Sequence, residues 1–353
     1  MAAGTRHVVA LVAAASLALA MLPSCGIRYV VVSGYYQAEM LARGEPVDGL
    51  LASGELSAGE EQRLRLFAEV KDFGKSIGLS ATDNYSNYAR SWPYTIYNLS
   101  ACPPLSFSPK TWWFPVVGTV PYLGYFQPED VATARVRLEA EGYEVHSRVV
   151  NAYSTLGWFK DPILPAMLTW PEPQVAETVL HELAHATLWI PGSVTFNESF
   201  ANVVGQAAGD QFLAQKYGED SKELADAREA DHDWLVFQSI LQGLYAELDA
   251  VYQSADPDDV RTEAKQRLYA SLDDRVLASA IRQKPRYLQI VRTQVWNNPR
   301  LMQFRTYNTG EAEFQALMER SNHDILVFIE EVRRLTRGAD DPFAALREAV
   351  TSR

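Results

Sequence analysis

Hydrophobic residues recur at helical spacing over most of this chain of 353 residues, and strand-like patterns are confined to one stretch before its middle. Residues 34–74 read as mostly helical, with a Gly-rich break. Residues 222–337 are almost all helical in pattern and are punctuated at Asp256-Pro257 and at Asn297-Asn298-Pro299. The pattern therefore predicts a mainly helical protein with a long helical C-terminal part.

The stretch before the middle has a different character. Residues 94–99, 112–118 and 121–126 are rich in aromatic and β-branched residues and are bounded by Pro and Gly, which is typical of short strands. Residues 128–141 return to a helical pattern, and residues 143–150 alternate like a strand. A compact α+β unit is predicted here.

Two further helices are predicted after this unit. The first begins after Pro173 and runs to about Trp189, where Pro191-Gly192 ends it, and the second spans residues 196–217. The predicted fold class is therefore α+β and predominantly helical, with a small β-containing part. The predicted regions are a leader at 1–24, a helical and short-strand region at 25–110, a core at 111–217 and a helical C-terminal region at 218–353.

The first 24 residues form a separate segment. Val8 to Leu22 is an apolar run of 15 residues interrupted only by Ser16, which is short for a membrane span and suits the core of a secretory signal. The run ends in Leu22-Pro23-Ser24-Cys25, with a Leu three residues before the Cys and a small residue directly before it, as in the bacterial lipobox. We expect Cys25 to carry lipid and to start the mature chain; an ordinary signal peptide is the alternative.

The lipobox interpretation has two consequences. Cys102 is the only other cysteine, so we expect it to form no disulfide and to be a buried apolar residue. Gly26 follows the lipidated position and does not supply the Asp-type retention signal, which favours an outer-membrane anchor facing the periplasm.

Composition narrows the class of protein. Hydrophobic residues make up 47% and charged residues 22% of the chain, which is typical of a globular protein. The net charge of −12 argues against nonspecific nucleic-acid binding, because that needs a basic surface.

The sharpest chemical signal is the H-E-x-x-H run from His181 to His185. Two His side chains four residues apart on a helix project from one face and can bind one zinc ion. Glu182, beside the first His, then faces the open side of the metal, where it can take a proton from a zinc-bound water. The alternative is a helix whose two histidines lie in a polar core.

A catalytic zinc needs a third protein ligand, and Glu198 is the candidate. Twelve residues separate it from His185, which is enough to end one helix, turn and begin a second helix packed against the first. Asn202 lies four residues later on the same face, where it can hydrogen-bond a His ring nitrogen. The alternative for Glu198 is a solvated carboxylate at a helix start.

These residues resemble a known group of enzymes. Asn197-Glu198-x-Phe200-Ala201 after the H-E-x-x-H run resembles the gluzincin metallopeptidases, whose third zinc ligand is the Glu of a similar run. More closely, the chain resembles the bacterial lipoprotein family described as putative zinc aminopeptidases. The blocks that carry this resemblance are Cys25, residues 35–38, 112–118, 121–126 and 152–159, Asp161-Pro162 and residues 181–201. The resemblance implies a zincin-like fold, one zinc ion per chain and a location in the cell envelope.

Other candidate residues follow from this resemblance. In zincins an extended strand lies above the metal helix and pairs with the substrate backbone, a role that falls on Ser154 to Gly157; an ordinary core strand is the alternative. Tyr153 and Tyr307 are candidate donors to the developing oxyanion, although either can be structural in a chain with 17 Tyr. Asp231-His232-Asp233 reads as a solvated cluster on a polar helix face.

Two functions are consistent with these residues. The first is a zinc-dependent peptidase of peptide or protein substrates in the bacterial envelope, with aminopeptidase favoured over endopeptidase. The second is a non-enzymatic envelope lipoprotein with a structural metal site or a client-holding role. An intact Glu182 favours the enzyme, because a structural zinc needs no base there. An aminopeptidase should present a carboxylate to the substrate's α-ammonium, and the sequence contains no G-x-M-E-N run to supply it.

Overall fold

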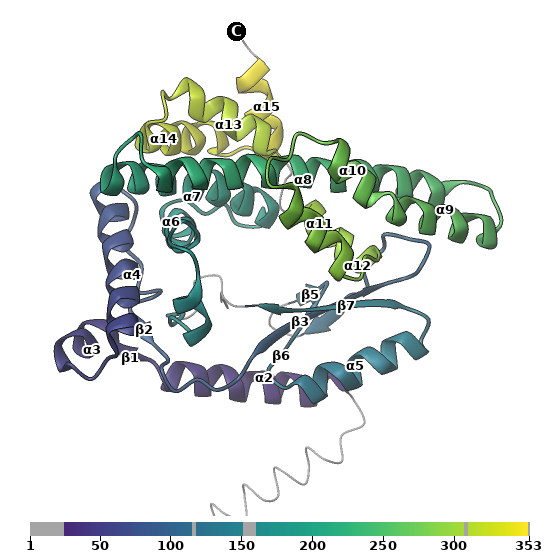
Figure 1. Ribbon diagram of the computed structural model, residues 1–353, viewed down its shortest axis with the longest axis horizontal. Helices are drawn as coiled ribbons and strands as arrows, with labels where there is room; N and C mark the ends of the chain where they lie inside the picture. Colours follow the sequence, from purple (N-terminus) through teal and green to yellow (C-terminus); the bar gives the residue numbers. More distant parts are fainter. Residues whose placement is uncertain (1–24, 115–117, 151–159, 307–309, 352–353) are drawn as a thin grey trace, which may run out of the picture.

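The computed structural model describes residues 25–114, 118–150, 160–306 and 310–351. Most of these residues are helical, and the strands between residues 96 and 150 fall in or beside the predicted segments, whereas the strand pair Glu45–Pro46 and Asn87–Tyr88 was not predicted. The chain is therefore α+β and predominantly helical, as its hydrophobic pattern indicates (Figure 1).

The N-terminal region consists of helices with one small pair of strands. Its elements are α2 (Cys25–Ala42), α3 (Val47–Ser53), α4 (Ala58–Ser76), β1 (Glu45–Pro46) and β2 (Asn87–Tyr88). Ser57 caps α4: its Oγ accepts a hydrogen bond from the Glu60 amide at 3.3 Å, and its own amide donates to the Glu60 carboxylate at 2.9 Å. This capping box starts the helix whose buried stripe packs on the centre of the molecule.

The main sheet has three antiparallel strands in the order β6-β3-β7. They are β3 (Ile96–Cys102), β6 (Leu123–Tyr125) and β7 (Glu144–Val150), with a separate pair formed by β4 (Trp112–Phe114) and β5 (Gly118–Val120). Helix α5 (Pro128–Ala140) covers one face of this sheet, where Leu138 packs against Leu99 and Val145. Because side chains alternate along a strand, Glu144, His146 and Arg148 lie on the opposite face.

Helix α6 (Glu172–Thr187) follows a short 3₁₀ turn, η1 (Pro165–Thr169), and packs between α4 and α7 (Val194–Tyr217). Two glycines allow this close approach. A Cβ on Gly74 of α4 would lie 2.4 Å from Leu183 Cδ1, and a Cβ on Gly205 of α7 would lie 2.8 Å from the Glu177 carbonyl oxygen. Helix α6 ends earlier than the predicted Trp189, because Leu188 is already extended.

The C-terminal helices divide between two apolar cores. They are α8 (Lys222–Gln253), α9 (Asp258–Ala270), α10 (Leu272–Ala278), α11 (Lys284–Thr293), α12 (Asn298–Thr306), α13 (Glu311–Arg320), α14 (Ile325–Thr336) and α15 (Pro342–Thr351). Helices α13 to α15 lie over α7, and Phe314 and Phe328 join the core that contains α6 (Figure 1). Helices α8 to α12 form a second core around Phe237 and Leu244.

Two expectations about single features can be compared with the structure. Cys102 is a free and fully buried thiol, in agreement with its predicted role as an apolar residue. None of the helices in the described part of the chain combines the length and the apolar content that a bilayer span requires.

Candidate metal centre

Three predicted ligands converge at the junction of α6 and α7. His181 and His185 lie one turn apart on α6, and Glu198 lies in the first turns of α7. The His181 Nε2 atom is 3.5 Å from Glu198 Oε2, and the His185 Nε2 atom is 3.5 Å from Glu198 Oε1. One donor atom of each residue lies within 4.8 Å of the others, so the tertiary fold brings the three side chains to one point.

The donor set fits a metal ion better than a hydrogen-bonded cluster. A separation of 3.5 Å is too long for a good hydrogen bond. Ligand atoms about 2.0–2.1 Å from one tetrahedral zinc lie roughly 3.3 Å apart, which is close to the observed spacing. Both ring nitrogens of His185 are buried and have no hydrogen-bond partner among the residues that the structure describes, although buried polar atoms usually have one. A cation bound by Nε2 would satisfy one of them.

Glu198 carries the charge that such a site needs. Its burial alone would raise the pKa of the carboxyl group, but contacts with His181 and His185 outweigh burial and lower the pKa to about 2. The group is therefore an anion at neutral pH, which is the form that binds a metal.

Asn197 holds the turn that positions Glu198. It is buried, its Oδ1 accepts a hydrogen bond from the Ile190 amide at 2.9 Å, and its Nδ2 donates to the Ile190 carbonyl at 2.8 Å. This pair of hydrogen bonds holds the start of α7 against the segment that follows α6. The sequence analysis assigned no role to Asn197; its place directly before the ligand was the available signal.

Glu182 faces the same cavity as His181 and Glu198. Tyr85 lies close enough that burial, then the charge of Glu182 and that of Asp161, raise the pKa of its hydroxyl well above the ordinary value. Tyr85 also has a positive φ of 57°, which is uncommon for a non-glycine residue and is found in strained functional sites. Nothing in the sequence singled it out.

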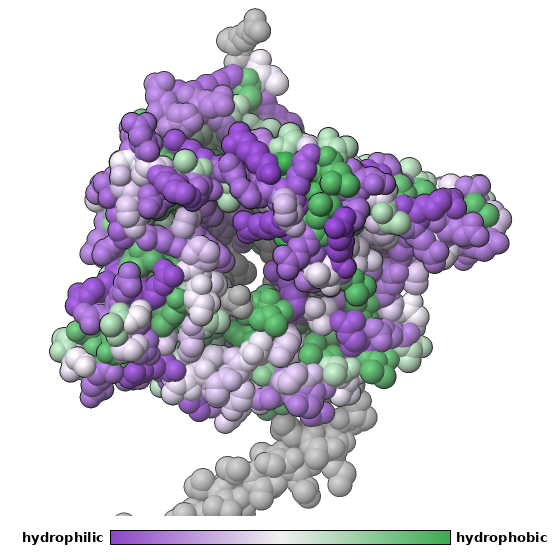
Figure 2. Space-filling view, in the orientation of Figure 1, coloured by the Kyte–Doolittle hydropathy of each residue, from purple (hydrophilic) through white to green (hydrophobic). Residues whose placement is uncertain are grey.

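The cavity that contains these residues has a volume of about 830 Å³, which is within the usual range of ligand sites. One wall is formed by α6, α7 and α8, and we call it the helical wall. The other is formed by β7 and α12, and we call it the strand wall. Figure 2 shows a hollow near the middle of this face of the molecule, between the regions of α6 and the sheet.

Acidic side chains outside the predicted set line the helical wall. Glu177 lies one turn before His181, and Asp231 lies on α8. Burial, followed by the charges of Asp231 and Asp210, raises the pKa of Glu177 to about 8. Burial also raises the pKa of Asp231. The expected solvated cluster at residues 231–233 is therefore wrong: Asp231 lines the cavity and Asp233 is fully buried.

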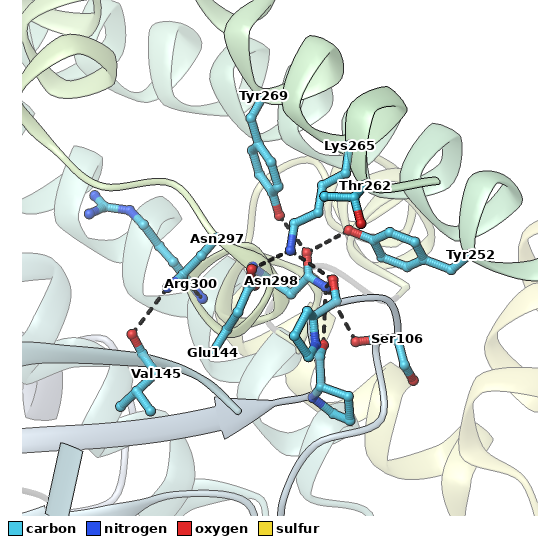
Figure 3. A network of polar contacts seen from close by, with 12 residues as sticks. Ser106, Glu144, Val145, Tyr252, Thr262, Lys265, Tyr269, Asn297, Asn298 and Arg300 are labelled. Carbon is cyan, nitrogen blue, oxygen red and sulfur yellow. Dashed lines mark hydrogen bonds and ion pairs between the residues drawn. The ribbon is translucent and has the colours of Figure 1, made fainter. Parts of the chain in front are cut away.

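A network of buried polar groups holds the strand wall together (Figure 3). Glu144 of β7 forms an ion pair with Lys265 of α9 and accepts a hydrogen bond from the Asn298 amide at 3.0 Å. The Asn298 Oδ1 atom accepts hydrogen bonds from Tyr252 at 2.7 Å and from Tyr269 at 2.9 Å. The network therefore fixes α12 against the sheet.

Of the remaining predicted site residues, Asn202 lies in the described part of the chain and the others do not. Asn202 lines the cavity, but no hydrogen bond between it and a histidine occurs among the described residues. Tyr153, Tyr307 and the segment from Ser154 to Gly157 lie outside the described residues. The edge of the sheet at the cavity is β7, which directly precedes that segment.

Comparisons with known proteins identify a family. A family model described as "Putative aminopeptidase" matches residues 28–344. No curated protein and no solved structure matches the chain. The match covers most of the chain, including the two helices that carry the candidate ligands.

Proposed function

The chain belongs to this aminopeptidase-like family, and on that premise we propose that it is a zinc-dependent aminopeptidase of the gluzincin type. The observation that carries the proposal is the convergence of His181, His185 and Glu198 beside Glu182 in one large cavity. The orphaned Nε2 atom of His185 adds to it, because a bound metal would satisfy this atom and no hydrogen-bond partner in the described protein does.

The two histidines and Glu198 would hold the zinc ion. When bound, zinc supplies a Lewis acid for the scissile carbonyl and favours deprotonation of the attacking water. Glu182 is then the general base: its carboxylate takes the proton from water as the carbonyl is attacked. The same carboxyl group returns that proton to the amine as the C–N bond breaks, so Glu182 ends the cycle ionised.

The acidic end of the cavity favours an aminopeptidase over an endopeptidase. An aminopeptidase must recognise the free α-ammonium next to the scissile bond. Glu177 lies about one helical turn from His181 and shares the cavity with Asp231. Burial and the mutual repulsion of the carboxylates keep Glu177 mainly protonated in the free protein, and a bound ammonium would favour its ionised form. The two carboxylates would then accept hydrogen bonds from the ammonium, the role that a G-x-M-E-N run would otherwise supply.

The decisive experiment replaces the base and leaves the metal ligands. Glu182→Gln should retain zinc and the fold but hydrolyse peptides at least ~100-fold more slowly, the scale of a positioned general base. Zinc content by metal analysis and product formation by mass spectrometry measure the two properties separately. Near-full activity of this variant would refute the mechanism. Loss of zinc would show instead that Glu182 helps to build the site.

We further propose that the protein is anchored in the bacterial envelope, at the outer membrane, by a lipid on Cys25. The apolar run that ends in Leu22-Pro23-Ser24-Cys25 supports this. Metabolic lipid labelling should mark the native protein and not a Cys25→Ser variant. Label that persists on the variant would exclude the lipobox.

A further inference from the structure

We propose that Arg148 and Arg300, on the strand wall, form a subsite for a carboxylate group of the substrate. This inference rests on the proposed peptidase function and defines its substrate class: peptides that carry a negative charge beyond the scissile bond. The ammonium end of the peptide would lie at Glu177 and Asp231 on the helical wall.

The first observation is that these two cations have no acidic partner within the part of the chain that the structure describes. Both line the cavity, and among the described residues neither forms an ion pair with a carboxylate. Among the described residues, the Arg300 guanidinium donates one hydrogen bond, to the Gln294 side-chain oxygen at 2.8 Å, and its Nε is buried without a partner. In a chain with a net charge of −12, the partly buried Arg300 is unexpected without a carboxylate partner in the described structure, and the exposed Arg148 lines the same cavity.

The second observation is that the two cations share one cavity, which Arg148 lines from β7 and Arg300 from α12. Burial, followed by the charge of Arg148, lowers the pKa of Arg300. His146 lies two residues before Arg148 on the same strand face, and burial with the charges of Arg300, Arg148 and Arg135 lowers its pKa to about 4. His146 is thus neutral at pH 7 and adds no positive charge. The mutual repulsion of the two arginines would be relieved by a bound anion.

The third observation is that the position of Arg300 is built into the fold. Asn297 and Asn298 begin α12, the helix that carries Arg300. Asn297 donates to the Val145 carbonyl at 3.1 Å, and Asn298 is bound to Glu144 of the same strand (Figure 3). The start of α12 is therefore fixed against β7, and this places the backbone of Arg300, whose guanidinium lies 4.5 Å from the centre of the Trp296 ring.

The ligand chemistry follows from the donors. A guanidinium offers paired N–H groups that match the two oxygens of a carboxylate. Within a peptide, that group is either the C-terminal carboxylate of a short substrate or an Asp or Glu side chain. Both sources place the negative charge at the strand wall while the amino terminus lies near the metal ligands.

The test uses three peptides of equal length and the zinc-loaded full chain. The peptides are a free acid, its C-terminal amide, and the amide with one Gln replaced by Glu. We expect kcat/KM for a carboxylate-bearing peptide to exceed that of the plain amide by ~10- to 100-fold, the range for hydrogen bonds to charged groups. A preference for the free acid identifies the C-terminal carboxylate, and a preference for the Glu peptide identifies the side chain.

Variants assign the effect to the arginines. Arg300→Gln and Arg148→Gln should each reduce the preference for the carboxylate-bearing peptide, and the double variant should bring the ratio near one. Arg300→Lys should restore part of it, because it retains the charge and loses the paired donors. Arg286→Gln is the matched control, since Arg286 is exposed on α11 and does not line the cavity.

Binding separates failure of the subsite from failure of the function. Calorimetry with Glu182→Gln protein measures affinity for the same three peptides without turnover. Equal affinity and equal kcat/KM for all three would overturn the subsite and leave the peptidase intact. Tighter binding of a carboxylate-bearing peptide without hydrolysis by the native protein would support the subsite and overturn the proposed function.

Discussion

The two walls of the cavity are built in different ways. The helical wall is held by apolar packing and by contacts between residues that are near in sequence, such as Asn197 with Ile190. The strand wall is held by buried polar groups that are far apart in sequence, such as Glu144 with Lys265. The proposed catalytic groups lie on the first wall, and the proposed carboxylate subsite lies on the second.

The proposed catalytic groups and the proposed recognition groups are therefore held in place by different kinds of interaction. Apolar packing is insensitive to the loss of any one polar contact, so the metal ligands keep their geometry. A buried polar network loses much more when one member is removed, because the remaining groups are left unsatisfied. We therefore expect changes in the two walls to have distinct signatures.

The largest expected effect comes from removing ligands in the helical wall. The double variant His181→Ala and His185→Ala should lose its bound zinc and all measurable hydrolysis, since Glu198 alone cannot hold the ion. His146→Ala is the matched control, because His146 lines the same cavity from the strand wall and should leave zinc content unchanged. Metal analysis after gel filtration measures both. Undiminished zinc in the double variant would place the metal elsewhere.

The next effect concerns the network of the strand wall. Lys265→Met leaves Glu144, whose side chain is 24% exposed, without its cation and should lower the free energy of unfolding by about 1–3 kcal/mol. Zinc content should survive, because the ligands lie on the other wall. Lys222→Met removes an ion pair whose partners are 80% and 64% exposed, and should leave the free energy of unfolding nearly unchanged, because solvent and salt screen such pairs. Equal destabilisation of the two variants in urea would remove the contrast between the walls.

A third prediction tests the close packing of α6 and α7. Gly205→Ala places a Cβ 2.8 Å from the Glu177 carbonyl oxygen, and should cost about 1–3 kcal/mol through overpacking. It should also weaken zinc binding, because the two helices carry the ligands between them. Gly243→Ala on α8 meets no atom within 4 Å and should stabilise by about 0.5–1 kcal/mol through helix propensity. Denaturation midpoints and zinc affinity check the pair; a neutral Gly205→Ala would mean that the helices can move apart.

The smallest expected effect is a pH dependence of the free energy of unfolding that comes from Asp233, in the region formed by helices α8 to α12. Asp233 accepts hydrogen bonds from the Arg282 and Gln283 amides, each at 2.7 Å. Burial raises its pKa, but these bonds and His232 outweigh burial, so the pKa lies below the ordinary value. Its stabilisation is therefore present at neutral pH and is lost as pH falls through the folded pKa.

Asp233→Asn should remove this component. Its free energy of unfolding should fall less steeply than that of the native protein as pH drops from about 5 through the ordinary Asp pKa of 3.8 and below it. Urea titrations at several pH values measure the two slopes. Parallel curves would show that Asp233 does not contribute to acid unfolding.

Local patterns predicted much of the helical wall. The positions of α6 and α7 follow from apolar periodicity and from Pro191-Gly192, and the spacing from His185 to Glu198 places the third ligand. The strands β3, β6 and β7 also fall in the segments that the aromatic and β-branched residues indicated. These features depend on neighbours along the chain, which a sequence displays directly.

The strand wall could not be predicted in this way. Arg148 looks like any exposed arginine on an alternating strand, and Asn298 like any polar residue before a proline. Asp233 was predicted to be solvated because its neighbours are polar. It is buried instead, and its carboxylate accepts hydrogen bonds from the Arg282 and Gln283 amides. Their roles depend on partners 49 to 195 residues away.

The sequence by itself therefore determined the helical class and the identity and spacing of the candidate ligands, because both depend on residues that are near one another along the chain. Only the tertiary structure decided which side chains share the cavity with Glu182: two acidic groups on α6 and α8, and two arginines on β7 and α12. The physical reason is that charge and burial act through space. A carboxylate or a guanidinium acquires its role from what the folded chain places beside it.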